Sequence, residues 1–268
     1  MKTRIIAAGI ALALATSTAQ AQVVYSNIPT TLAPNYPSQP YQAQAVSQFG
    51  NLLHLGAGGR NLTSVVFTMS TWAYESQYQA VGTSPGWLYN FTMNVYAVGP
   101  SGSVGASLGS LTSAQLVPWR PEPTPGCAGT TWLNVPDNTC YNGNAFNMTF
   151  DFAGSLIVPD DIILGLAFDT QSYGANPTGV NGPYNSLNVA AGPSTTTVGS
   201  NDADVAYVAT TYPGWTPARG PEFGRDTGWG DYAPMIEVQT TTPEPASMVL
   251  LATGLVGLGG IQIRRRRK

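Results

Sequence analysis

One pattern in the sequence is typical of nucleophilic catalysis. Gly105-Ala106-Ser107-Leu108-Gly109 matches the Gly-x-Ser-x-Gly turn that presents the serine of α/β-hydrolases between a strand and a helix. In those enzymes the catalytic histidine follows the serine in the chain, whereas the single histidine of this chain, His54, precedes Ser107. The residues around Ser107 are small and indicate a loop without a helix. We therefore interpret the match as a coincidence, and we expect His54 at the edge of a strand.

Paired carboxylates are a second route to catalysis, because glycosidases place two of them on either side of the bond that they cleave. The chain has 14 acidic residues, but no spacing among them singles out a pair. Asp160-Asp161 follows Pro159 and is typical of a turn that opens the apolar run beginning at Ile162. We therefore predict a protein that is not an enzyme.

Oxygen ligands for a metal ion occur together in Asn201-Asp202-Ala203-Asp204. Two carboxylates and an amide in an acidic chain suit Ca²⁺, which takes about six to eight oxygen ligands. The segment lacks the glycine and the distal glutamate of an EF-hand loop, and an Asx-type turn is the simpler interpretation. We therefore expect no cofactor, and Asp202 and Asp204 remain weak candidates for a Ca²⁺ site.

Aromatic side chains close to glycine or proline form the most suggestive group. Exposed aromatic faces can stack on sugar rings or on a partner surface, whereas buried ones fill the ends of a β-sandwich. For each tryptophan taken alone, the structural role is the simpler interpretation. The residues concerned are Trp87, Trp119, Trp132, Trp215, Trp229, Tyr173, Tyr184, Tyr212 and Tyr232.

Short strands must position these side chains. Several segments alternate apolar and polar residues, which predicts strands with one buried face, and residues 162–168 are apolar throughout, which predicts a central strand covered on both faces. We expect Glu237 and Gln239 on the outer face of the last strand. Residues 22–45 contain four prolines and indicate an extended segment. The predicted strands are 62–72, 89–98, 146–152, 162–168, 205–209 and 235–238.

No part of the body, residues 22–240, shows sustained apolar spacing of the helical kind, so we predict an all-β fold. Short strands separated by Gly, Pro and Asn turns suit a single jelly-roll-like antiparallel β-sandwich, and two small sandwiches are the alternative. The stretch Leu62-Thr63-Ser64-Val65, the loop with two cysteines and the alternating segment 145–152 also resemble bacterial secreted proteins with no known activity.

The N-terminal residues have the three parts of a secretory signal peptide. Lys2 and Arg4 precede the apolar run 5–15, and Ala19-Gln20-Ala21 supplies the small residues that signal peptidase recognises. We therefore predict a signal helix within residues 1–21, removed by cleavage after Ala21. A buried N-terminal helix is the alternative.

The C-terminal residues, 243–268, again join an apolar run to basic charges. Pro243-Glu244-Pro245 precedes 18 uncharged residues, 246–263, and then Arg264, Arg265, Arg266, Arg267 and Lys268. A helix of that length spans about 27 Å, close to the roughly 30 Å of a bilayer core, so we predict a transmembrane helix over 246–263. The positive-inside rule keeps the basic tail, 264–268, in the cytoplasm and places the body outside.

These three parts resemble the PEP-CTERM sorting signal of Gram-negative bacteria, over about the last 26 residues. The resemblance implies processing by an exosortase, a membrane-embedded cysteine transpeptidase-like enzyme. Pro243, Glu244, Pro245, Arg264, Arg265, Arg266 and Arg267 are then recognition residues. It also implies a location in the cell envelope or the extracellular matrix. An ordinary single-span anchor is the alternative.

The charges and the cysteines fit an exported body. It keeps four arginines, no lysine and 13 of the 14 acidic residues, which gives a formal charge of −9. Nucleic acids and anionic membrane surfaces need a basic footprint and are poor partners, whereas an exopolysaccharide is compatible with this charge. Export favours a disulfide between Cys127 and Cys140, for which the chain-entropy model gives about 3 kcal/mol.

We therefore predict an exported structural or interaction protein without enzymatic activity. Its partners during processing are signal peptidase and an exosortase, and the segment 246–263 connects it to the membrane. A polysaccharide-binding module is the alternative function, and a glycoside-active enzyme is the third.

Overall fold

The computed structural model describes residues 21–241, which form 16 strands and four short 3-10 helices. The predicted signal helix and the predicted transmembrane helix lie outside the described residues. Within residues 21–241, no helix has the length and apolar character that a membrane span requires. The 3-10 helices are η1 (Gln42–Gln44), η2 (Glu75–Gln77), η3 (Pro100–Gly102) and η4 (Pro183–Ser186).

The first sheet is built around β4 (Asn61–Thr71). One side of β4 pairs along its length with β9 (Asn144–Ile157). The other side pairs first with β16 (Ile236–Thr241) and then with β11 (Leu187–Pro193). The remaining strands are β1 (Gln22–Ser26), which pairs with β16, and β2 (Ser38–Pro40) and β15 (Tyr232–Pro234), which both pair with β11.

The second sheet contains, in order, β14 (Gly224–Thr227), β13 (Val205–Thr210), β3 (Val46–His54), β10 (Asp161–Phe168), β5 (Gly86–Val98) and β6 (Val104–Pro118). The short strand β12 (Ser200–Asn201) pairs with the end of β3. Both large sheets have seven strands, and all pairs of named strands are antiparallel. A separate hairpin joins β7 (Trp132–Asn134) to β8 (Thr139–Tyr141).

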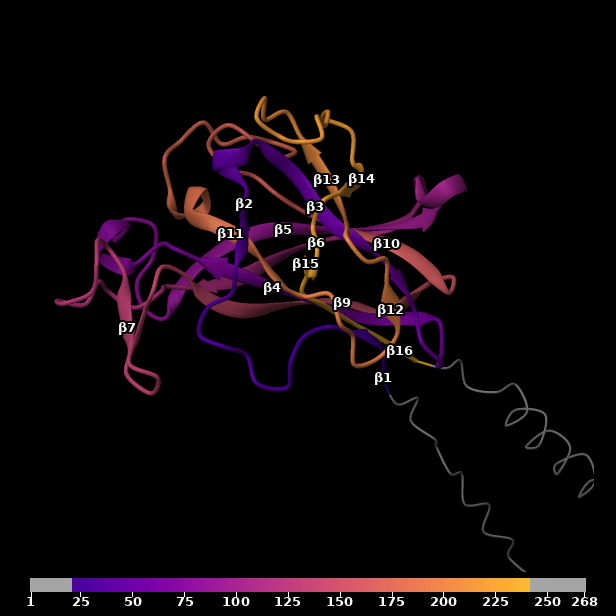
Figure 1. The fold of residues 1–268 in the computed structure, drawn as a ribbon, viewed down its shortest axis with the longest axis horizontal. Coiled ribbons are helices and arrows are strands. Elements are labelled where there is room, and N and C mark those ends of the chain that lie inside the picture. The colour runs from indigo at the N-terminus through magenta and orange to yellow at the C-terminus, as the bar shows by residue number, and fades with distance from the viewer. Residues whose placement is uncertain (1–20, 242–268) are drawn as a thin grey trace, which may run out of the picture. The chain divides into compact units, whose positions relative to one another are not determined.

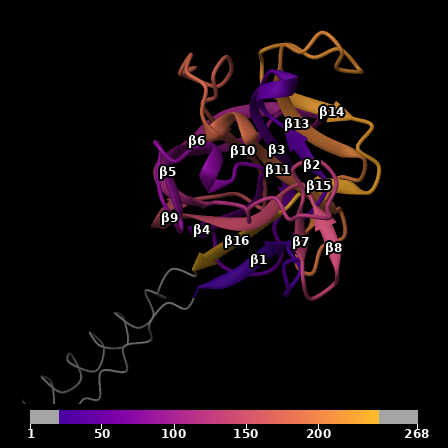
Figure 2. The same cartoon turned by 90° about the vertical axis from the view of Figure 1, so that its left-hand side faces the viewer.

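The two seven-stranded sheets share one hydrophobic core (Figures 1 and 2). Val65 and Phe67 of β4 contribute to it from the first sheet, and Phe91 and Met93 of β5 contribute from the second. All four side chains are fully buried. The all-β prediction is therefore confirmed.

The six predicted strands all occur, as β4, β5, β9, β10, β13 and β16. Residues 162–167 of β10 are buried, as expected for a strand between β3 and β5 with both faces covered. In β9, Phe146, Met148 and Phe150 are buried while the residues between them are exposed. Two-residue periodicity thus located β9, and an unbroken apolar run located β10.

The prediction of a loop around Ser107 is wrong, because residues 104–118 form β6. This strand lies at the edge of the second sheet, and its inner residues Leu108 and Leu111 are only partly buried. Small and polar residues occupy most of its other positions, so no apolar alternation marks it. The segment 22–45, predicted to be extended, contains β1, β2 and η1.

The described ends of the chain lie side by side, because Gln22 of β1 pairs with Thr240 of β16. In Figure 1 these two strands reach the lower right of the molecule, whereas the loop between β13 and β14 lies at the top. The 3-10 helix η1 lies next to that loop, since Thr210 donates a hydrogen bond from Oγ1 to the carbonyl oxygen of Gln44 at 2.6 Å.

Candidate functional site

Two adjoining pockets form a groove beside the loop between β13 and β14. Their volumes are about 340 and 260 Å³, and Gln39, Gly228 and Trp229 line both of them. A volume of this order suits a small ligand or a short part of a polymer. We call this region the aromatic groove and define it by Gln39, Gln44, Tyr212, Trp215, Asp226, Trp229 and Tyr232.

One buried carboxylate holds the two tryptophans of the aromatic groove. The indole nitrogens of Trp215 and Trp229 both donate hydrogen bonds to Asp226 Oδ2, at 3.1 and 3.0 Å. Asp226 lies on β14 and is 3% exposed. The other oxygen, Oδ1, is buried and accepts no hydrogen bond from any residue in the range 21–241. Hydrogen bonds to a charged acceptor are the strong kind, so Asp226 fixes the direction of both rings.

The ring of Trp229 is also supported from the core. It lies 5.1 Å from the ring of Phe49 and 6.2 Å from that of Trp215, measured between centroids. Gly228 and Gly230, on either side of Trp229, have φ angles of 97° and 57°. This backbone conformation favours glycine, so the two glycines allow the chain to turn sharply around the ring.

Polar and half-exposed side chains complete the aromatic groove. Gln39 and Gln44 are joined by a hydrogen bond between their amide groups. Tyr212 and Tyr232 are 40% and 50% exposed. Aromatic faces beside amides that donate and accept hydrogen bonds suit a ligand with apolar ring faces and many hydroxyl groups.

Four of the other aromatic residues singled out in the sequence, Trp87, Trp119, Trp132 and Tyr184, have structural surroundings. Trp87 and Trp119 are buried with their ring centroids 6.0 Å apart. Trp132 is buried and donates from its indole nitrogen to the carbonyl oxygen of Gly143 at 2.9 Å. Tyr184 stacks on Tyr89. Four of the nine aromatic residues line the groove, namely Tyr212, Trp215, Trp229 and Tyr232. Their spacing in the sequence did not predict that these four would come together.

Most carboxylates outside the groove are engaged in local structure. Glu122 accepts from the backbone nitrogen and the hydroxyl of Ser76, and Glu75 accepts from the same two groups of Ser84. The hydroxyl of Tyr141 donates to Asp137 and lowers the pKa of that carboxyl. Such carboxylates stabilise turns.

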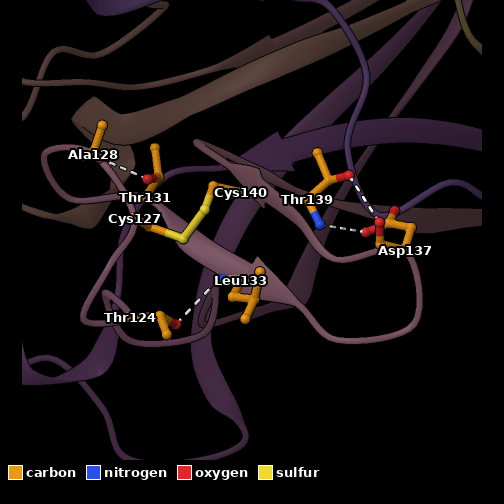
Figure 3. The surroundings of a disulfide bond; sticks show 8 residues. All are labelled: Thr124, Cys127, Ala128, Thr131, Leu133, Asp137, Thr139 and Cys140. Atoms are coloured by element: carbon orange, nitrogen blue, oxygen red, sulfur yellow. Dashed lines mark hydrogen bonds between the residues drawn. A yellow bond between two sulfur atoms is a disulfide. The ribbon is translucent and has the colours of Figure 1, made fainter.

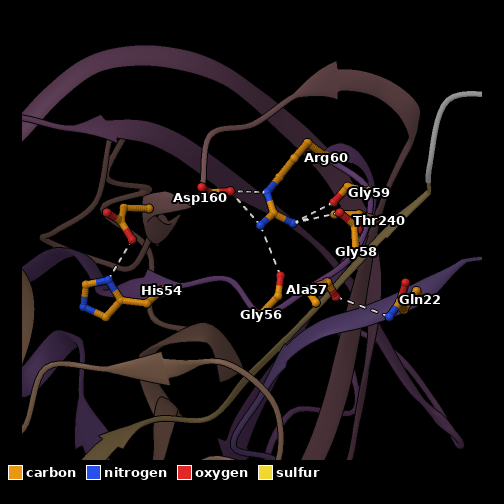
Figure 4. Close-up of polar contacts among 10 residues, drawn as sticks. Gln22, His54, Gly56, Ala57, Gly58, Gly59, Arg60, Asp160 and Thr240 are labelled. Atoms are coloured by element: carbon orange, nitrogen blue, oxygen red, sulfur yellow. Dashed lines mark hydrogen bonds and ion pairs between the residues drawn. The ribbon is translucent and has the colours of Figure 1, made fainter.

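His54 lies at the end of β3, as expected, and bridges two carboxylates. Its Nδ1 is 2.7 Å from Asp161 Oδ1, and its Nε2 is 3.2 Å from Asp202 Oδ1. Burial alone would lower the pKa of His54, but the hydrogen bonds and charges of the two aspartates outweigh it and raise the pKa. Nearby, the Arg60 guanidinium pairs with Asp160 and donates to carbonyl oxygens of the 56–59 turn (Figure 4).

The two weak candidates for a Ca²⁺ site point to different partners. Asp202 contacts His54, and Asp204 Oδ1 accepts from the backbone nitrogen of Gly230 at 2.6 Å. Among residues 21–241, no group of three or more His, Cys, Asp or Glu side chains is arranged to hold a metal ion. Asp204 instead supports the loop that carries Trp229.

Comparison with protein families finds one match. Residues 241–267 match the model of the PEP-CTERM protein-sorting motif. The chain carries a PEP-CTERM sorting signal. No curated protein and no solved structure matches the chain. The family match therefore concerns the C-terminal signal and leaves the role of the body to be argued from its own residues.

The PEP-CTERM signal makes the chain an exported protein that is sorted to the envelope and processed by an exosortase. The recognition residues expected from the sequence, Pro243 to Pro245 and Arg264 to Arg267, fall within the matched range but outside the described residues. The same holds for the predicted cleavage residue Ala19, whereas Ala21 is the first described residue and directly precedes β1.

The body of this PEP-CTERM protein contains the expected disulfide. Cys127 and Cys140 are bonded, with their Cα atoms 5.8 Å apart, and Cys140 lies in β8 (Figure 3). The bond closes the loop 127–140, and Thr124, which precedes this loop, accepts with its Oγ1 from the backbone nitrogen of Leu133 within it. Such a bond fits the oxidising compartments to which exported proteins are delivered.

Proposed function

We propose that this exported protein binds a polysaccharide of the cell envelope or the extracellular matrix through the aromatic groove and is not an enzyme. Trp215 and Trp229, both held by Asp226, carry this proposal. The carboxylate fixes the ring planes before a ligand arrives, so less conformational freedom is lost on binding. Preorganised aromatic faces are a suitable platform for sugar rings.

Charge favours a neutral glycan as the ligand of the groove. The body has a formal charge of −9, and the groove residues include one ionisable carboxylate, Asp226, and no arginine, lysine or histidine among the described lining residues. A polyanion would be repelled by such a surface. Glycoside hydrolysis uses two carboxylates, so a single one in the groove favours binding over cleavage.

Affinity electrophoresis through gels with embedded neutral polysaccharides tests the proposal on the full-length protein. We expect at least one glycan to retard the wild type, and Trp215→Ala to remove the retardation. Trp72→Ala is the matched control, because Trp72 is 41% exposed and lies outside the groove. Equal migration of the wild type and Trp215→Ala through every gel would contradict a role of the groove in glycan binding.

We further propose the finer features of sorting and fold. The signal peptide ends at Ala21, residues 246–263 span the membrane before processing, and the host is a Gram-negative bacterium. The body forms a single jelly-roll-like sandwich. Deletion of residues 243–268 tests the sorting, since a tagged body without them should leave the envelope fraction. An unchanged cell fraction after the deletion would contradict it.

A further inference from the structure

Asp226 places a negative charge at the aromatic groove without a positive partner. This residue is 3% exposed and lines the larger of the two pockets. Among residues 21–241, the ion pairs are those of His54 and Arg60, so no basic side chain pairs with Asp226 there. In a buried position little solvent screens a charge. The carboxylate therefore leaves an uncompensated negative potential around it.

The hydrogen bonds of Asp226 bring this charge to the edges of two aromatic rings. The indole nitrogens of Trp215 and Trp229 lie 3.1 and 3.0 Å from Oδ2. Both tryptophans are partly exposed and line the larger pocket. The face of an aromatic ring is already negative because of its quadrupole, and a hydrogen bond to an anion polarises the indole further. Both rings therefore favour a positive group above their faces.

The remaining lining of the groove also suits a cation with an organic surface. The ring centroids of Trp215 and Trp229 are 6.2 Å apart, and the two planes are inclined by 42°. A cation attracted by an aromatic face lies within about 6 Å of the ring centroid, so one group can lie within reach of both rings. Neither pocket has an arginine, lysine or histidine in the part of its lining that the structure describes. No positive side chain there repels a cation.

An ammonium group fits these surroundings better than a metal ion. A metal ion such as Ca²⁺ takes about six to eight oxygen ligands, whereas the groove has one carboxylate. Within the range 21–241, no group of three or more His, Cys, Asp or Glu side chains is arranged to hold a metal ion. An ammonium group needs only aromatic faces and a nearby negative charge. Among glycans, such a group belongs to amino sugars whose amine is not acetylated.

We propose that the polysaccharide bound in the aromatic groove contains amino sugars with a free, protonated amine. This inference rests on the proposed glycan binding and sharpens it, because the groove accepts a neutral sugar ring and prefers one that carries an ammonium group. The formal charge of −9, which opposes a polyanion, attracts such a glycan to the body.

Asp226 acts in this proposal through the tryptophans, since Oδ1 is buried and Oδ2 accepts from both indoles. It is a positioning residue for the rings and also the source of the charge that favours an ammonium group. A purely structural role would affect the binding of charged and neutral sugars alike. The ratio of the two affinities therefore separates the charge of Asp226 from its role in holding the rings.

Calorimetric titration of the full-length protein with a β-1,4-linked glucosamine trimer and with cellotriose tests the inference. Cellotriose has a hydroxyl group in place of each amine, and a slightly acidic buffer keeps the amines protonated. We expect the wild type to bind the glucosamine trimer about tenfold more tightly than cellotriose. In Asp226→Asn the ratio of the two affinities should fall to about two or less, whatever the change in each affinity.

Asp231→Asn is the matched control, because it removes one negative charge from an exposed position on the loop that carries Trp229. It should keep the preference of the wild type for the glucosamine trimer. An equal loss of preference in Asp226→Asn and Asp231→Asn would overturn the inference, since the overall charge of the body would then be the cause. Tetramethylammonium binding as tightly as the glucosamine trimer would also overturn it, because the sugar would then play no part.

The gel experiment separates failure of this inference from failure of glycan binding. If a neutral polysaccharide retards the wild type, but the glucosamine trimer binds no more tightly than cellotriose or neither trimer binds, glycan binding stands and the preference for amino sugars is wrong. If no gel retards the wild type and neither trimer binds, the proposed function fails, and this inference fails with it.

Discussion

Replacement of Asp226 offers the sharpest test of how the aromatic groove is held. Asp226→Ala removes both hydrogen bonds from the indoles of Trp215 and Trp229, and bonds to a charged acceptor contribute about 1.5–3 kcal/mol each. Part of the lost free energy is regained for two reasons. The partly buried indole nitrogens can donate hydrogen bonds to water, and the variant no longer buries the unpaired Oδ1 of Asp226. We expect a net loss of about 3 kcal/mol in the free energy of unfolding.

Asp226→Asn has the same shape and separates charge from geometry. Its carbonyl oxygen can replace Oδ2 and accept both indole hydrogens, while its amide nitrogen would occupy the buried position of Oδ1 without a partner. The hydrogen bonds then become neutral, and we expect a loss of about 1–2 kcal/mol. Unfolding by urea, followed by far-ultraviolet circular dichroism, measures both losses.

Near-ultraviolet circular dichroism reports the fixed orientation of the tryptophan rings. We expect its signal to fall in Asp226→Ala, together with glycan retardation. Asp231→Asn is the control, because Asp231 is an exposed carboxylate on the loop that carries Trp229. If both Asp226 variants unfold within about 0.5 kcal/mol of the wild type and keep the near-ultraviolet signal, Asp226 does not hold the rings.

Three further perturbations have defined outcomes. The folded state raises the pKa of His54 above its ordinary value of 6.5. The stability that the protonated His54 contributes is therefore complete below pH 6.5 and is lost as the pH rises through the raised pKa. Urea midpoints from about pH 5 to pH 9 should therefore fall less steeply in His54→Ala, and identical slopes would exclude the bridge to Asp161 and Asp202. Gly50→Ala should lower the free energy of unfolding by more than about 4 kcal/mol, because a Cβ would lie 1.7 Å from the carbonyl oxygen of Leu164. Gly220→Ala serves as the control, since a Cβ there meets open space. Equal melting temperatures of the two variants would refute the close approach at Gly50. Replacing Cys127 and Cys140 by serine should lower the free energy of unfolding by up to about 3 kcal/mol, and a wild type treated with reductant should match the double variant; a stability unaffected by either treatment would show that the bond constrains little.

Periodicity in the sequence was sufficient for strands with one strongly apolar face. The alternation of Phe146, Met148 and Phe150 predicted β9, and the unbroken apolar run 162–168 predicted a strand buried on both faces. The sequence did not predict the edge strand β6, because few of its side chains are buried and most of its residues are small. The sequence also did not predict β3 and β11, because Gly50, Asn51 and Asn188 interrupt the apolar residues of these strands.

The aromatic groove could be predicted only in part. The sequence indicated aromatic residues in loops, but its residues come from the segments 39–44, 212–215 and 226–232, which strand pairing brings together. The decisive contact joins Asp226 to two tryptophans in different loops, and no local pattern encodes it. The expected disulfide needed only the pairing of two cysteines, so it was accessible from the sequence.

The pairing of β16 also decides how the body responds to mechanical force. β16 carries the chain toward the sorting signal and is hydrogen-bonded on one side to β1 and on the other to β4. The hydrogen bonds of an antiparallel ladder run across the strands, so a pull along β16 loads many of them at once in shear. They cannot then break one by one, as they would if the strand were peeled away. Because β16 is held from both sides, a pull from the end at which the chain continues is shared between β1 and β4.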